Sequence, residues 1–274
     1  MQAASAIYTI WLREFKAFTR ERSRIVAMIG QPLIYLLIVG QGIASGLNLK
    51  GASSDVGYLL FMYPGILGMS VLFTSIFAGI SIIWDRQFGF LKEVLVAPVP
   101  RWAVAIGKIL GGATVAMAQS VILIALAPFI GVSLSVGFVL QLLSICFLIS
   151  IAITGLGVVI ASSMRSLQGF QMLMNFLVMP LYFLSGAMFP IMFAPGWMKV
   201  LMTLDPLTYG VDGLRIIVLS AAPAATMSQT SLEQTARMSG LVRWDLPFDA
   251  AIMALVGVLL AALAAVRFNR AENQ

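Results

Sequence analysis

The residues that most invite a chemical interpretation form one short stretch, FGFLKEVLVAPVPR at positions 88–101, which lies between two long apolar runs. It combines a glycine, an acid and two basic residues with several large apolar side chains. Pro98 and Pro100 would stop a helix and fix an extended turn. The stretch is too short for a domain and too apolar for an exposed loop. We therefore interpret it as a short amphipathic helix that fits a groove on another protein; a loop packed on its own helix ends is the alternative.

The composition excludes most catalytic and metal chemistry. The 274 residues include no His, and the single Cys, Cys146, lies within an uncharged run. Imidazole-centred acid–base chemistry, His or Cys metal sites and an internal disulfide are therefore not expected. The sequence G-x-x-x-x-G-K-[ST], which cradles nucleotide phosphates, does not occur either. We expect no catalytic residue, no metal site and no ATP site in this chain.

Hydropathy indicates an all-α integral membrane protein. Only 10% of the residues are charged, against about 25% in soluble proteins. Uncharged runs cover 25–49, 56–84, 109–164, 166–198 and 250–266. About 20 apolar residues suffice to cross a bilayer core about 30 Å thick, so the longest run has room for two spans, hinged near Pro128, Gly131 and Ser133. Six spans are predicted, at about 25–46, 57–84, 106–130, 136–163, 168–190 and 247–267.

The basic residues predict the orientation. With six spans, both termini lie on one side, together with the segments 84–108 and 163–169. Most of the 17 Lys and Arg residues fall on that side, and the positive-inside rule makes it cytoplasmic. The net charge of +6 is thus interpreted as a topology signal, and nucleic acid is not expected as a partner. We predict a multi-pass protein of the bacterial inner membrane, with a 25–268 membrane domain and a cytoplasmic tail at 269–274.

The segment 1–24 is predicted to form an amphipathic interface helix. On a helical wheel one face carries Ile7, Tyr8, Trp11, Leu12, Phe15 and Phe18, and the opposite face carries Arg13, Lys16, Arg20 and Arg24. Such a helix suits the headgroup plane of a membrane. One interpretation is a generic positive anchor for the first span. The other is that Arg13, Lys16 and Arg20 also contact a cytoplasmic partner.

Three segments resemble one family. FGFLKEVLVAPVPRWAVAIGK at 88–108 is similar to the signature of ABC-2 type permeases, the membrane subunits of ATP-binding cassette exporters. The matching residues are Gly89, Glu93, Pro98, Arg101, Gly107 and Lys108. Phe90 stands where many members carry Thr, which is closer to the branch of daunorubicin-type drug and nodulation-factor exporters. SGAMFPI at 185–191 with DPLTYGVDGLR at 205–215, and the N-terminal REFKAFTRERSR, resemble further segments of the family.

The resemblance implies an architecture and a set of partners. Two six-span subunits would pair, here as a homodimer within membrane lipid, and each would dock on a cytoplasmic ATPase that binds the ATP and Mg. The segment between spans 2 and 3 would be the coupling helix, and the segment between spans 5 and 6 would form re-entrant external helices. The expected docking residues are Arg86, Phe88, Gly89, Phe90, Lys92, Glu93, Pro98 and Arg101. Spans 1, 2 and 5 would lie near the dimer seam, so Gln31, Tyr35, Asn175 and Met179 are the expected substrate-path residues.

The expected function is that of a permease subunit without its own ATPase activity. It would move a hydrophobic drug-like, lipid-linked or saccharide compound out of the cytoplasm or inner leaflet. A non-transporting membrane anchor that assembles a complex is the main alternative. A membrane enzyme is disfavoured because His is absent and no acidic or nucleophile cluster lines a span, and a channel is disfavoured because no charged ring marks a pore.

Overall fold

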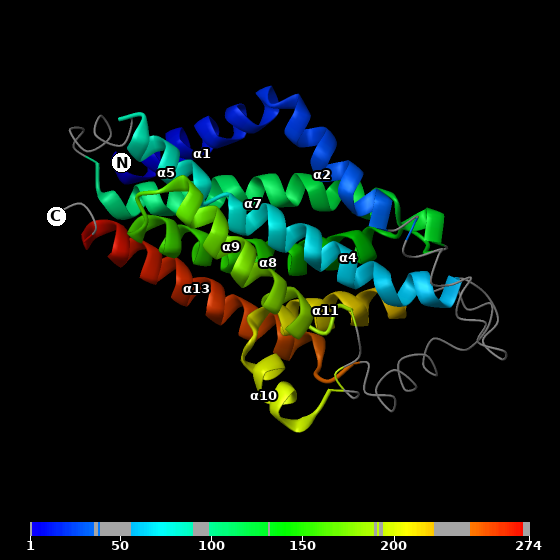
Figure 1. Ribbon diagram of the computed structural model, residues 1–274. Helices are drawn as coiled ribbons and strands as arrows, with labels where there is room; N and C mark the ends of the chain where they lie inside the picture. The colour runs from blue at the N-terminus through cyan, green and yellow to red at the C-terminus, as the bar shows by residue number, and fades with distance from the viewer. Residues whose placement is uncertain are drawn as a thin grey trace.

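The fold is a bundle of long helices. A computed structural model describes residues 2–35, 38, 56–89, 99–130, 132–188, 191, 194–221 and 242–270, and these ranges contain helices and no strand. The elements are α1 (Gln2–Arg20), α2 (Arg22–Ile34), α4 (Val56–Phe77), α5 (Ile80–Gln87), α7 (Arg101–Ala125), η2 (Ala127–Ile130), α8 (Val136–Ser163), α9 (Leu167–Leu184), α10 (Gly196–Leu204), α11 (Pro206–Ser220) and α13 (Leu246–Arg270). The start of α1 and the end of α13 lie at one end of the bundle, called here the termini end (Figure 1).

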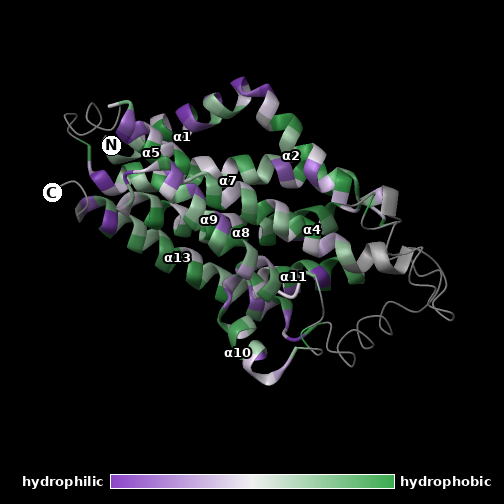
Figure 2. Cartoon of the chain, viewed as in Figure 1, coloured by the Kyte–Doolittle hydropathy of each residue, from purple (hydrophilic) through white to green (hydrophobic). Residues whose placement is uncertain are grey.

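Among the described residues, five helical stretches are long and apolar enough to cross a membrane. They are Met62–Gln87, Arg101–Ala125, Val136–Ser163, Leu167–Leu184 and Leu246–Asn269. They correspond to the second to sixth predicted spans and indicate a multi-pass membrane protein. The first predicted span is described only in part, and its apolar helix Ile25–Ile34 is shorter. The six-span count and the boundaries at 24 and 268 therefore stay predictions. Figure 2 shows apolar residues along the bundle and hydrophilic residues gathered on α1 and at the termini end.

Small residues set the close crossing of three core helices. A Cβ on Gly157 of α8 would lie 2.5 Å from the carbonyl oxygen of Ile76, and one on Gly79 would lie 2.7 Å from the carbonyl oxygen of Gly157. A Cβ on Gly112 of α7 would lie 2.6 Å from the Cβ of Ala78. These distances leave room for a hydrogen atom only, so glycine is what allows the backbones to approach. The crossing falls at the short break between α4 and α5.

Caps fix the boundaries of the next elements. The predicted hinge in the longest uncharged run is present, because α7 ends at Ala125, η2 follows, and Ser135 caps α8 by accepting a hydrogen bond from the Phe138 amide at 3.2 Å. Asp205 caps α11 in the same way, with Oδ1 accepting from the Leu207 amide at 2.9 Å. Pro206 then occupies the first helical turn, a position that tolerates its missing N–H.

Helix α11 is packed into the bundle by its polar residues as well as its apolar ones. Asp212 Oδ2 accepts hydrogen bonds from the amides of Arg243 and Trp244, at 3.0 and 3.1 Å, immediately before α13. Arg215 donates to the carbonyl oxygen of Gly186 at 2.9 Å. These contacts bind α11 to the end of α9 and the start of α13. Whether α10 and α11 re-enter a membrane stays a prediction.

Candidate functional site

Helix α1 lies against the first half of α7 because α7 presents two glycines there. A Cβ on Gly107 would lie 2.9 Å from the Cβ of Ile10, and one on Gly111 would lie 2.6 Å from the Cβ of Glu14. The indole N–H of Trp11 donates to Thr114 Oγ1 at 2.8 Å, next to this contact. The interface helix is therefore held by the bundle itself, through an apolar contact that ends in a charged residue, Glu14.

Glu14 belongs to a network of four charged side chains. Lys108 Nζ of α7 donates to Glu14 Oε1 at 2.6 Å and also pairs with Asp85 of α5. Arg13 Nη2 donates to Glu14 Oε1 at 2.9 Å and to Asp85 as well. Ser81 Oγ accepts a further hydrogen bond from Lys108 Nζ at 3.1 Å. Two cations and two anions thus join α1, α5 and α7, and we call these four residues the charge network.

The side chains of the charge network are largely buried, which strengthens the interactions between their charges. The Lys108 side chain is only 2% exposed, and Glu14 and Asp85 are 17% and 13% exposed. Burial by itself raises the pKa of Glu14, but the nearby Lys108 and then Arg13 outweigh it, so that the pKa of Glu14 lies below its ordinary value. Burial by itself lowers the pKa of Arg13, but its hydrogen bonds and ion pairs with Asp85 and Glu14 outweigh burial. The pKa of Arg13 therefore lies above its ordinary value. Glu14 and Arg13 therefore stay charged at neutral pH.

The charge network lies at both ends of the predicted coupling segment. Asp85 precedes the end of α5 at Gln87, and α7 begins at Arg101 with Lys108 two turns further on. Arg86 Nη1 and Nη2 donate to the carbonyl oxygens of Met164 and Ser162, at 2.6 and 3.0 Å. These carbonyls lie at the C-terminal end of α8, where helices leave acceptors unsatisfied. Contacts at the two ends of the segment between α5 and α7 therefore connect it to α1 and α8.

The predicted docking residues fall into three groups. Arg86 and Arg101 make contacts within the chain, Arg101 through Nη1 to the Asn269 carbonyl oxygen at 3.4 Å. Phe88 is 84% exposed, and Gly89 has φ +79°, a left-handed conformation that favours glycine after a helix. The remaining four lie outside the described residues: Phe90, Lys92, Glu93 and Pro98. On α1, Lys16 and Arg20 are exposed, whereas Arg13 points into the charge network.

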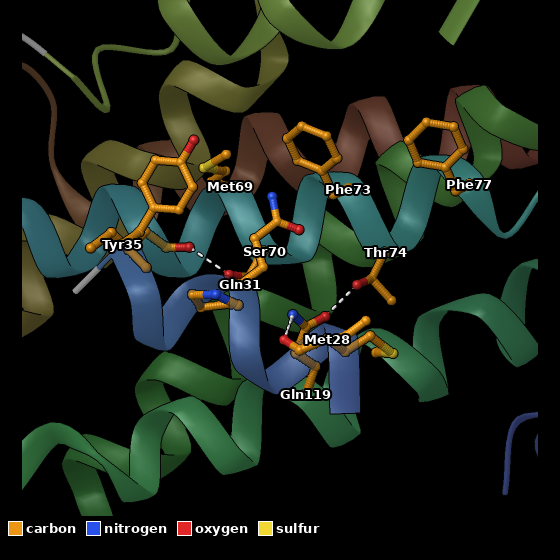
Figure 3. Close-up of a pocket in the computed structure, with 12 residues that line it drawn as sticks. Met28, Gln31, Tyr35, Met69, Ser70, Phe73, Thr74, Phe77 and Gln119 are labelled. Atoms are coloured by element: carbon orange, nitrogen blue, oxygen red, sulfur yellow. Dashed lines mark hydrogen bonds between the residues drawn. The ribbon is translucent and has the colours of Figure 1, made fainter. Parts of the chain in front are cut away.

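Two of the four predicted substrate-path residues line a common cavity. A cavity of about 220 Å³ lies between α2, α4 and α7, and Gln31 and Tyr35 are part of its wall (Figure 3). Asn175 and Met179 are not; they lie on an exposed face of α9. The structure therefore brings Gln31 and Tyr35 together and leaves the other two apart from them within this chain.

Sequence reasoning missed the polar partners on both sides of this site. Gln119 of α7 accepts a hydrogen bond from Thr74 Oγ1 of α4, and its Nε2 donates to the Met28 carbonyl oxygen of α2 at 2.9 Å. Glu14 and Lys108 were likewise not paired in advance. The sequence does mark two of these residues as unusual: Glu14 is an acid inside a basic helix, and Gln119 is a large polar residue inside an uncharged run. Neither signal names the partner.

Comparison with known proteins establishes the family. A family model described as ABC-2 type transporter matches residues 5–219, which is most of the chain. The chain belongs to the ABC-2 type transporter family. The match to the family runs from α1 to α11, so it includes the charge network, the cavity and the segment predicted to be the coupling helix. The resemblance found in the sequence is thereby confirmed.

Named relatives of the chain include permeases from several sources. The proposed transport permease ycf38 of Cyanophora paradoxa is 27% identical over 218 residues, 77% of this chain and 73% of that protein. Nodulation protein J of Rhizobium meliloti (strain 1021) is 25% identical over 215 residues, covering 77% of this chain and 80% of the relative. The inner membrane transport permease YadH of Escherichia coli (strain K12) is 26% identical over 216 residues, 77% and 81% of the two chains.

Proposed function

We propose that this ABC-2 family chain is the permease subunit of an ATP-driven exporter, powered by a separate ATPase that docks on the segment 88–101. The membrane would be the bacterial inner membrane, as the name of the relative YadH supports, with both termini in the cytoplasm. The observation that carries the proposal is the charge network, because it ties α1, α5 and α7 together where that segment leaves and rejoins the bundle.

The geometry suggests how a pull on this segment reaches the membrane helices. Breaking a buried ion pair is costly, so α1, α5 and α7 move together. Helix α5 continues from α4 after the break at Ala78 and Gly79, and α4 and α7 both line the cavity that contains Gln31. A displacement that begins at Phe88 or Arg101 therefore reshapes the wall of that cavity. Closure of the partner ATPase on ATP would supply the displacement.

The exposed surfaces of the chain are consistent with the partners this function needs. Lys16 and Arg20 leave a basic face of α1 open for a cytoplasmic protein. Met172 and Phe176 of α9 are 75% and 74% exposed, which suits lipid or a second copy of the permease. A bulky hydrophobic or lipid-linked compound is the cargo that we favour, and the name of the nodulation relative is compatible with it.

The proposal is tested by accumulation of compounds in cells that lack the chain. A panel of uncharged, lipid-linked and drug-like fluorescent compounds is loaded into the deletion strain and into the same strain carrying the gene. We expect at least one compound to accumulate in the deletion strain and to be cleared when the gene is restored. Equal accumulation of every compound would contradict export and favour a non-transporting anchor.

A further inference from the structure

Two neighbouring cavities lie beside helices α4 and α7. The first, which we call the glutamine cavity, is lined by Ala27, Met28, Gln31, Pro32, Tyr35, Ile66, Met69, Ser70, Phe73, Thr74, Phe77 and Gln119. The second, of about 530 Å³, is called here the ionic cavity; its lining includes Arg13, Glu14, Glu21, Asp85 and Gly111. Phe77 belongs to both linings. The glutamine cavity borders α2 and the ionic cavity borders α1, with Gln171 of α9 also in the lining of the ionic cavity.

The polar groups of the glutamine cavity are all uncharged. They are two amides, from Gln31 and Gln119, and three hydroxyls, from Tyr35, Ser70 and Thr74. None of the described residues in this lining is ionisable as a carboxylate, ammonium or guanidinium, whereas the ionic cavity has four such residues. A charged group moved into the glutamine cavity would lose water without meeting an opposite charge, which is strongly unfavourable.

The hydrogen-bonding groups of the glutamine cavity are partly fixed in place. The amide of Gln119 is held from both sides, by Thr74 and by the Met28 carbonyl oxygen, and it is only 4% exposed. Ser70 Oγ donates to the Ile66 carbonyl oxygen at 2.8 Å, which leaves its own lone pairs to accept a bond. Gln31 is exposed to the space that these side chains surround (Figure 3). The wall thus offers both donors and acceptors beside Met and Phe surfaces.

We propose that the glutamine cavity is a binding site for an uncharged amphiphile, one whose polar part carries hydroxyl, ether or amide groups. Its volume is below the range of about 300–1,000 Å³ that is usual for whole ligands, so it takes one part of a larger molecule. The Met and Phe side chains accept the apolar part, and Met adapts to varied shapes. That the glutamine cavity binds the exported compound rests on the proposed export function. Its preference for uncharged over charged ligands does not depend on that function.

The test is protection of an introduced cysteine from a maleimide, with the full chain in lipid nanodiscs. Ala27 is small, exposed and part of the cavity wall, so Ala27→Cys reports on occupancy. Val26 is 71% exposed, lies next to it and is outside the lining, so Val26→Cys is the matched control. Cys146 is fully buried and provides an inert background. The probes share one tail and differ in charge: octyl glucoside, octyl sulfate and octyltrimethylammonium.

We expect octyl glucoside alone to protect Ala27→Cys. At about ten times its Kd, labelling should slow about tenfold, because the free fraction of sites falls as 1/(1 + [L]/Kd). Adding Gln31→Leu should raise the Kd about fivefold, the value of one lost hydrogen bond, so that the same probe concentration slows labelling only about threefold. Equal protection by the charged probes, equal protection of Val26→Cys, or no effect of Gln31→Leu would each overturn the proposal.

Two further arms separate the sources of the ligand and the two proposals. Discs that contain a neutral diacyl glucoside lipid are compared with discs of phosphatidylglycerol alone. Slower labelling of Ala27→Cys in the glucolipid discs, before any probe is added, identifies a resident lipid of the same chemistry. No ATPase is present in this assay. Selective protection in a chain that exports nothing would support the binding site and contradict the export function. Export by a chain that shows no selective protection would contradict the binding site and support the export function.

Discussion

Lys108→Met is expected to lower the free energy of unfolding by about 3–5 kcal/mol, the usual cost of breaking a buried ion pair from one side. Methionine keeps most of the side-chain volume, so the loss comes from charge and not from a cavity. Glu14 and Asp85 would be left with Arg13 as their one cation within the network. Thermal unfolding of the detergent-purified chain, followed by circular dichroism, measures the effect.

The matched control is Lys16→Met, because Lys16 is exposed on the same helix that carries Glu14. It should change stability by no more than about 0.5 kcal/mol, as surface substitutions usually do. Adding Glu14→Gln to Lys108→Met restores charge balance to the network and should recover part of the loss. If Lys108→Met were no worse than Lys16→Met, the charge network would not hold α1 to the bundle.

Glu93→Ala is expected to uncouple ATP hydrolysis from transport while leaving membrane insertion intact. Glu93 lies in the segment proposed to enter the ATPase groove, where charged residues set the register of the contact. We expect export in cells to fall about tenfold or more, equivalent to about 1.4 kcal/mol of lost coupling. The measurement compares export, stimulated ATPase activity and the amount of chain in the membrane.

Glu272→Ala provides the control for Glu93→Ala. It removes the same charge from the C-terminal tail, which is predicted to lie on the same side of the membrane, and should leave export unchanged. Normal export by Glu93→Ala at normal expression would remove Glu93 from the coupling role, even if the rest of the segment still docks.

The sequence predicted the elements of this fold better than their contacts. Uncharged runs locate helices because the length of a span is a property of the chain and the bilayer alone. A helical wheel placed the buried face of α1 only in part, because Ile10 was not on the predicted apolar face and Arg13 of the predicted basic face points into the charge network. Ile10 and Phe18 are buried against the bundle, whereas Tyr8 on the same helix is 59% exposed. Ile10 is buried because it lies against Gly107 of α7, a contact that no pattern within α1 reveals.

The candidate site was predicted in parts because its partners are far apart in the chain. Glu14 and Lys108 are 94 residues apart, and Thr74 and Gln119 are 45 apart. Periodicity within a helix carries no information about such pairs. Gln31 and Tyr35 were predicted because the family resemblance would place span 1 near a dimer seam, and the structure puts both in the wall of one cavity. Asn175 and Met179 were predicted on the same ground for span 5, and within this chain they lie on an exposed face of α9.

The most direct test of the central claim is a mild-detergent pull-down of the tagged chain from its native membrane, with ATPase activity assayed in the eluate. It is run beside a Gly89→Ala/Glu93→Ala variant, which alters the left-handed turn after α5 and the acid that follows it. We predict that a cytoplasmic ATPase elutes with the wild-type chain and is lost from the variant at equal yield. An eluate without ATPase activity in every detergent tried, or a variant that retains the ATPase in full, would contradict docking through residues 88–101.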